Sequence, residues 1–170
     1  SKRQFSMALE DRSANFSPCR QYRYALWRTW GGITGYAMFI CLNPSTADAT
    51  TDDRTVRRCI GFVHDWGYSG LCVTNLFAYR ATDPRDMKAQ VDPIGSDNDA
   101  WLRDTASLAS VVVAAWGVHG CHHDRDRAVL TLLAGFPLMC LGLTKNGSPR
   151  HPLFLSKNTK PIPWRLGVNV

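Results

Sequence analysis

The chain has 170 residues, of which 45% are apolar, and a formal net charge of +6 at pH 7. Its length predicts one domain, residues 1–170, with a core of ordinary size. The basic excess favours a polyanionic or phosphate-bearing partner. No apolar run is long enough to span a bilayer and no signal-peptide pattern is present, so we expect a cytoplasmic protein without membrane contact.

The six cysteines favour a reducing compartment. Cys41, Cys72 and Cys140 lie in apolar runs, and Cys59 lies on the apolar face of an expected helix, as is typical of buried reduced cysteines. No C-x-x-C pair is present, so we predict no zinc or iron–sulfur site and no cofactor. Residues 119–123 hold three histidines and a cysteine. Adjacent histidines in a loop point in different directions, and we therefore expect a loop without metal.

Strands and helices are expected to alternate along the chain. Residues 1–18 are polar and we expect them to be irregular, whereas 22–30 alternate between two faces and predict an added strand. We interpret 22–30 as a sheet edge shielded by large side chains, although its aromatic and basic residues could also contact nucleic acid. Uncharged apolar runs predict four buried strands, near 36–42, 70–76, 110–116 and 137–142.

Helices are expected between these strands. The clearest signal covers residues 53–66, with Thr51 or Asp52 as the cap. Further helices are expected to begin at Pro84, to follow a cap at Ser96 and to cover 124–134. This alternation predicts an α/β fold with three layers, α/β/α, around a four-stranded parallel sheet.

Polar residues follow the carboxyl ends of the four expected strands. They are Asn43, Asn75, Trp116 and the loop 142–152, which contains His151. Open α/β sheets bind their ligands in the crevice at this edge. We therefore expect these residues to line one cleft.

Two residues near this edge have side chains suited to chemistry. His151 stands between Arg150 and Pro152, and a histidine in so stiff a loop can donate a hydrogen bond to a developing anion or act as an acid. Seen alone, it would be an ordinary surface histidine. Asp53 follows Asp52, and its position favours helix capping, with a second role in the reaction left open.

Five segments together resemble a known family. They are Phe39–Asp48, Asp53–Cys59, Thr74–Pro84, Trp116-Gly117 and Pro149–Leu155. The combination is similar to the bacterial and phage family called domain of unknown function 1643, over roughly residues 17–165. That family name implies no activity.

A more distant resemblance is to the uracil-DNA glycosylase superfamily. Leu42-Asn43-Pro44 is similar to its first motif in the form Gly-Ile-Asn-Pro-Gly, and His151–Ser156 is similar to its second motif, His-Pro-Ser-Pro-Leu-Ser. Thr74-Asn75 followed by Tyr79-Arg80 resembles the middle strand and loop of the thermostable members. The resemblance implies the same four-stranded parallel sheet and hydrolysis of an N-glycosidic bond in DNA.

The resemblance also implies residue roles. Asn43 would position the attacking water, Asn75 would read the base edge, and His151 would donate to the departing base. The other expected contacts are Ser45 near the base, Phe77 or Trp116 stacked on it, and Arg80, Lys145 and Arg150 on phosphates.

Departures from the glycosylase motifs keep other functions open. Ser45 stands where the first motif has glycine, Leu153 stands where the second has serine, and Asn43 is not the carboxylate of the most active members. One alternative is a module that binds nucleic acid or a nucleotide without catalysis. The other is a different transformation of a nucleotide or base.

Overall fold

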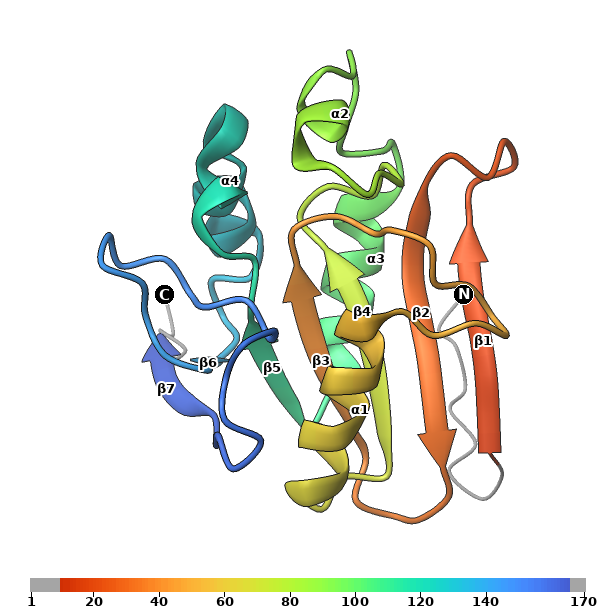
Figure 1. Ribbon diagram of the computed structural model, residues 1–170, viewed down its shortest axis with the longest axis vertical. Coiled ribbons are helices and arrows are strands. Elements are labelled where there is room, and N and C mark those ends of the chain that lie inside the picture. The colour runs from red at the N-terminus through yellow and green to blue at the C-terminus, as the bar shows by residue number, and fades with distance from the viewer. Residues whose placement is uncertain (1–9, 166–170) are drawn as a thin grey trace.

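Seven strands form one mixed sheet in the computed structural model, which describes residues 10–165 (Figure 1). The strand order is β1-β2-β4-β3-β5-β6-β7. Their bounds are β1 Glu10–Phe16, β2 Arg23–Trp30, β3 Tyr36–Cys41, β4 Gly70–Asn75, β5 Val111–Ala114, β6 Leu138–Cys140 and β7 Ile162–Arg165.

The four expected buried strands are neighbours, as predicted. β4, β3, β5 and β6 lie side by side and every pair among these neighbours is parallel. The sheet is nevertheless wider than the four strands plus one that we expected. β2 and β1 extend it with antiparallel pairing beyond β4, and β7 adds an antiparallel strand beyond β6. The α/β class is confirmed, and the central four strands bring their carboxyl ends to one edge.

The prediction that residues 1–18 are irregular is wrong for β1. Residues 10–16 pair with β2 along their whole length, whereas residues 1–9 lie outside the described part of the chain. β1 is a polar edge strand, Glu-Asp-Arg-Ser-Ala-Asn-Phe. Backbone pairing with β2 holds it in the sheet, so its side chains do not have to alternate between apolar and polar, and the sequence shows no such alternation. That residues 1–170 form a single domain stays a prediction.

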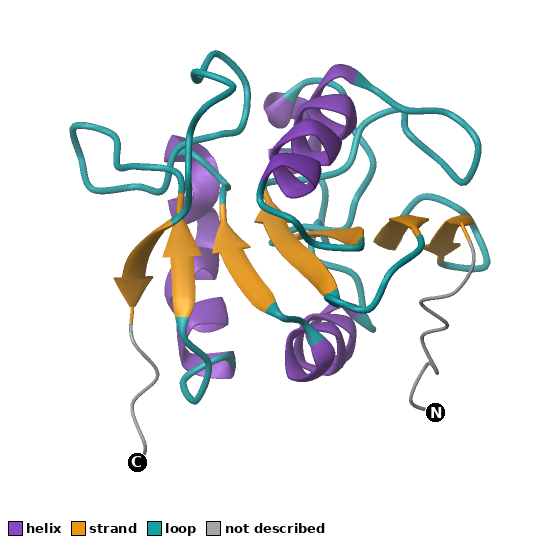
Figure 2. Ribbon diagram, turned by 90° about the horizontal axis from the view of Figure 1, so that it is seen from below, coloured by secondary structure: helices purple, strands orange, loops and turns teal. Residues whose placement is uncertain are grey.

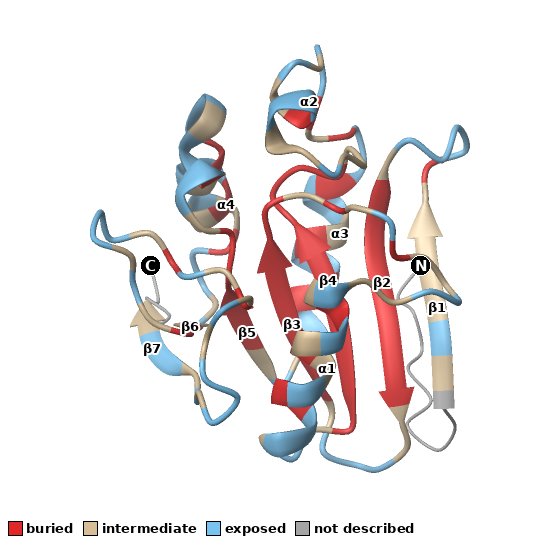
Figure 3. Ribbon diagram, in the orientation of Figure 1, coloured by how far each residue is buried: buried red, intermediate tan, exposed pale blue. Residues whose placement is uncertain are grey.

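β2 is consequently an interior strand and not the sheet edge that we favoured. Seven of its eight residues are buried between β1 and β4 (Figure 3). Arg28 is one of them, and its side chain binds the Asp52 carboxylate at 2.8 Å and donates to the carbonyls of Asp48 and Thr51. The loop between β3 and the next helix is therefore anchored from inside the protein.

Helices lie on both sides of the strands (Figure 2). α1, Arg54–Asp65, packs the apolar side chains of its buried face against one face of the sheet. α3 and α4 pack against the other face together with α2. The remaining helical bounds are α2 Pro84–Lys88, α3 Asn98–Leu108, the 3₁₀ segment η1 Val118–Asp124 and α4 Arg125–Leu132.

Two helix caps differ from the prediction. α1 is capped by Asp53, whose Oδ1 accepts from the Val56 amide at 2.8 Å, because Asp52 is occupied by Arg28. α3 begins after Asp97 without a side-chain cap, so Ser96 does not cap it.

The cysteines behave largely as expected from the sequence. Cys41, Cys59, Cys72 and Cys140 are buried, and no cysteine within residues 10–165 forms a disulfide. Residues 10–165 contain no group of three or more His, Cys, Asp or Glu side chains that could hold a metal ion. None of the helices in this part of the chain has the length and apolarity needed to cross a membrane.

Candidate functional site

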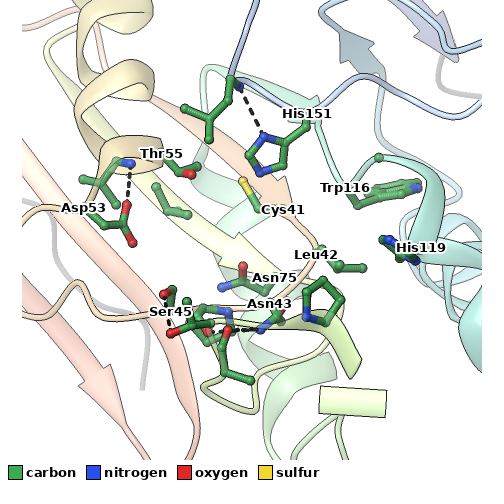
Figure 4. A pocket seen from close by; sticks show the side chains of 18 of the residues that line it. Cys41, Leu42, Asn43, Ser45, Asp53, Thr55, Asn75, Trp116, His119 and His151 are labelled. Carbon is green, nitrogen blue, oxygen red and sulfur yellow. Dashed lines mark hydrogen bonds between the residues drawn. The ribbon is translucent and has the colours of Figure 1, made fainter. Parts of the chain in front are cut away.

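A pocket of about 540 Å³ opens at the carboxyl ends of β3, β4 and β5 (Figure 4). Segments far apart in the sequence contribute to its wall, as the parallel strands predicted. Of the ten residues expected at the site, six line this pocket: Asn43, Ser45, Asp53, Asn75, Trp116 and His151. The structure thus brings together the two asparagines and the histidine on which the proposed chemistry depends.

Asn75 ends β4 with a buried amide that faces the pocket. Its side chain is 1% exposed, and within the described residues its Nδ2 has no hydrogen-bond partner. Its backbone is fixed, because the Asn98 side chain donates to the carbonyls of Asn75 and Leu76 at 2.9 and 3.0 Å. An unpaired buried donor typically costs about 1–3 kcal/mol. The Asn75 amide is therefore a donor held ready for an acceptor on a ligand.

Replacing Asn75 with leucine is expected to separate stability from binding. The free energy of unfolding of the ligand-free protein should rise by about 1 kcal/mol, because an unpaired buried donor disappears at similar side-chain volume. Ligand affinity should fall at the same time. Urea unfolding and ligand titration on both proteins check this. Lower stability with unchanged affinity would instead make Asn75 a structural residue.

His151 presents an N–H group to the same pocket. Its Nδ1 accepts a hydrogen bond from the Leu153 amide at 3.2 Å, which places the proton of the neutral ring on Nε2. Burial lowers the pKa of His151 below its usual value, and Asp53 opposes this shift. The neutral imidazole is thus the dominant form at pH 7, with Nε2–H as a donor. Figure 4 shows the ring in the pocket beside Cys41.

The pH titration of His151 should reflect this arrangement. Since the folded-state pKa of His151 is lowered, the folded protein binds fewer protons than the unfolded chain. The contribution of the neutral His151 to the free energy of unfolding is therefore present above about pH 6.5 and is lost on acidification. We expect ¹⁵N-edited NMR to show the Nε2–H tautomer and a midpoint below 6.5. A midpoint above that value, or the Nδ1–H tautomer, would contradict the assignment.

Asn43 follows β3, and its side chain joins the loop after β3 to the loop that contains Ala81 by hydrogen bonds. Its Nδ2 donates to the carbonyls of Ala81 and Pro44 at 2.8 and 3.1 Å, so its amide nitrogen is occupied and its Oδ1 is left as an acceptor. Ser45 lies beside it, with its hydroxyl 3.4 Å from that of Thr82. This part of the wall can therefore accept a hydrogen bond from water or substrate.

A carboxylate and a buried guanidinium stand on the next part of the wall. Asp53 uses Oδ1 as the helix cap, while its side chain also borders the pocket. Arg23 on β2 is 2% exposed and donates to the Ala47 carbonyl at 3.0 Å, and its Nε has no partner within residues 10–165. Burial lowers the pKa of Arg23 to about 10, whereas Asp53 raises it. Arg23 therefore remains a cation at neutral pH.

Trp116 closes the pocket on the side of β5. Its ring is 2% exposed and packs edge-on against Trp164, with the centroids 5.5 Å apart. Gly117 follows with φ of +71°, a conformation that favours glycine, and its N–H donates to the Pro149 carbonyl at 2.8 Å. This bond connects the end of β5 to the loop that carries His151.

The other four expected site residues lie outside this pocket. Phe77 is fully buried in the core, with its ring 5.7 Å from that of His122, so it cannot stack on a base. Lys145 is exposed on the turn between Thr144 and Ser148. Arg150 is also exposed and donates to the Leu143 carbonyl at 3.1 Å. Arg80 borders a separate hollow, described below.

Sequence reasoning missed several residues of the pocket wall. Arg23 was hidden because β2 was interpreted as an edge strand, whereas its guanidinium is buried and donates to the Ala47 carbonyl in the loop before α1. His119 lines the rim, with its Nδ1 2.9 Å from Lys88 Nζ, although the cluster 119–123 looked like a plain loop. Cys41 at the end of β3 could have been predicted as a pocket residue, because it lies only two residues before Asn43, which was expected at the site.

A family model matches this chain over residues 23–153. The chain belongs to the family described as Protein of unknown function (DUF1643). Every residue that lines the pocket falls within the matched range, so the pocket lies wholly inside the segment that defines the family. Searches of curated proteins and of solved structures found no match.

Proposed function

We propose that this DUF1643 protein is a nucleobase N-glycosidase-like hydrolase that acts on a modified or damaged base in DNA. The observation that carries the proposal is the fixed Nε2–H of a neutral His151 in a pocket that also holds the unpaired Asn75 amide. Two donors in one partly enclosed site suit a ligand with two acceptors on one edge. A nucleobase carbonyl flanked by a second acceptor has this pattern.

His151 would act on the departing base. When the bond between the base and the sugar breaks, the electron pair goes to the base and negative charge develops on its carbonyl oxygen. A preorganised donor aimed at such an oxygen lowers the barrier because its interaction strengthens in the transition state. A neutral imidazole serves this role without having to transfer its proton.

Asn43 and Asp53 would act on the water. The free Oδ1 of Asn43 can accept one hydrogen bond from it, and the Asp53 carboxylate can take up the proton as the oxygen adds to C1′ of the sugar. The buried guanidinium of Arg23 stands on the same part of the wall as this carboxylate. The base leaves as its anion and then takes a proton from the solvent, and Asp53 returns its proton to the solvent, so the products are the free base and a sugar hydroxyl.

The resemblance to uracil-DNA glycosylases supports the same chemistry. The resembling segments supply Asn43, Asn75 and His151, and these three side chains line one pocket. The four parallel strands at the centre of the sheet agree with the fold that the resemblance implies. Fold and motif likeness supports an activity only together with the site itself.

The proposal is tested by incubating the protein with DNA that carries a series of modified bases and identifying released bases by mass spectrometry. We expect at least one base to be released by wild-type protein and to be released much more slowly by the His151→Ala variant. DNA binding without release from any substrate would favour the non-catalytic binding module. A mass change in the nucleotide with the base still attached would favour a different transformation.

A further inference from the structure

Two arginine-lined hollows adjoin the candidate pocket, and we propose that they bind the phosphates on either side of the nucleotide that occupies it. This inference rests on the proposed function and deepens it, because it makes the substrate a nucleic-acid strand and not a free nucleoside or nucleotide. The first hollow contains Arg20 and Arg80, and the second contains Arg54 and Arg57.

The first hollow places two guanidinium groups on one ring. Arg20 and Arg80 lie 4.2 and 4.9 Å from the centroid of Phe16, and the ion pairs found between residues 10–165 involve neither arginine. Two like charges held together without a carboxylate repel each other unless an anion joins them. The hollow, about 500 Å³, also contains the hydroxyl groups of Ser45, Thr46 and Thr82, which are suitable phosphate donors.

The second hollow lies where α1 meets the His151 loop. Arg58 is used structurally, since it donates to the Leu155 carbonyl and lies over Phe62. The Arg54 side chain makes no hydrogen bond or ion pair within residues 10–165, and its guanidinium lies 5.9 Å from the ring of Phe154, which is 90% exposed. An unpaired arginine beside an exposed aromatic ring suits a phosphate and the base next to it.

The two hollows adjoin different parts of the pocket. The first shares Ser45, Ala81 and Thr82 with it, whereas the second shares Arg54 and Leu153. In Figure 4, Ser45 lies at one end of the pocket and Thr55 and His151 lie at the other. A strand that places one base in the pocket would therefore extend into both hollows. A nucleoside monophosphate, which has a single phosphate group, could occupy only one.

The experiment measures binding of a fluorescently labelled 12-nucleotide oligothymidylate by anisotropy over a range of salt concentrations, because phosphate contacts do not depend on the base. The variants are Arg20→Ala/Arg80→Ala and Arg54→Ala/Arg57→Ala. The matched control, Arg103→Ala/Arg127→Ala, removes the same charge from exposed positions on α3 and α4 that line neither the pocket nor the two hollows. Circular dichroism confirms folding, and glutamine replaces alanine in any pair that does not fold.

Each flanking pair should reduce the salt slope by about 0.7, since it removes one single-stranded phosphate contact, and should weaken binding about fivefold at 0.1 M salt. The control should bind like wild type, and thymidine monophosphate should compete only weakly. An equal loss in the control, or wild-type slopes in the flanking pairs, would overturn the subsites. Base release without these slope changes would refute the subsites alone, and the slope changes without base release would refute the hydrolase alone.

Discussion

Replacing His151 with alanine is expected to slow base release about a hundred- to a thousandfold while strand affinity changes little. The loss corresponds to about 2.7–4 kcal/mol, as is typical when one preorganised donor to a developing anion is removed. The effect should fall on kcat and not on KM, because the Nε2–H interaction strengthens only as the base departs. Single-turnover kinetics on the released base, together with binding of the same DNA, measure the two quantities.

The matched control for this substitution is His64→Ala. His64 lies on α1 and stacks on Trp30 with the ring centroids 3.8 Å apart, outside the pocket. It should leave the turnover rate within about twofold of wild type, since it contacts no reacting group. A similar loss in both variants, or a His151 variant that loses only affinity, would remove the catalytic assignment.

Replacing Phe77 with alanine should destabilise the fold by about 3–5 kcal/mol, because this ring is fully buried in the core. Once the fraction of folded protein is taken into account, ligand affinity should be unchanged. Chemical denaturation checks the first statement and binding at low temperature checks the second.

Phe154→Ala is the matched comparison for Phe77. This ring is 90% exposed, so its removal should change the free energy of unfolding by no more than about 0.5 kcal/mol. Strand affinity should fall, since the exposed ring borders the second arginine hollow. A stable Phe77 variant with weakened binding would restore the stacking role that the resemblance implied for Phe77.

The central strands could be predicted from sequence because burial on both faces leaves a plain signal. β3 is a continuous apolar run, β4 is an uncharged run that ends in Thr74-Asn75, and all residues of both are buried. The shared edge then follows from their parallel direction, which is why Asn43 and Asn75 could be placed in one cleft before the structure was known.

β1 and the hidden arginine could not be predicted in this way. The sequence of β1 does not alternate between apolar and polar residues, and the strand is held in the sheet by its backbone pairing with β2. Arg23 looks exposed on a strand that alternates, and its burial depends on a neighbour that the local pattern does not reveal. Phe77 illustrates the converse error, because an aromatic residue two positions after a site residue can still point into the core.

The buried anchor at Arg28 has a consequence for the thermodynamics of recognition. By binding Asp52 and the carbonyls of Asp48 and Thr51, it fixes the loop that ends in Asp53. Ligands that meet a disordered loop lose part of their interaction energy in ordering it. Here the loop is ordered by contacts inside the protein, so little conformational entropy is lost when substrate arrives. Association should then be limited by encounter and not by closure of this wall.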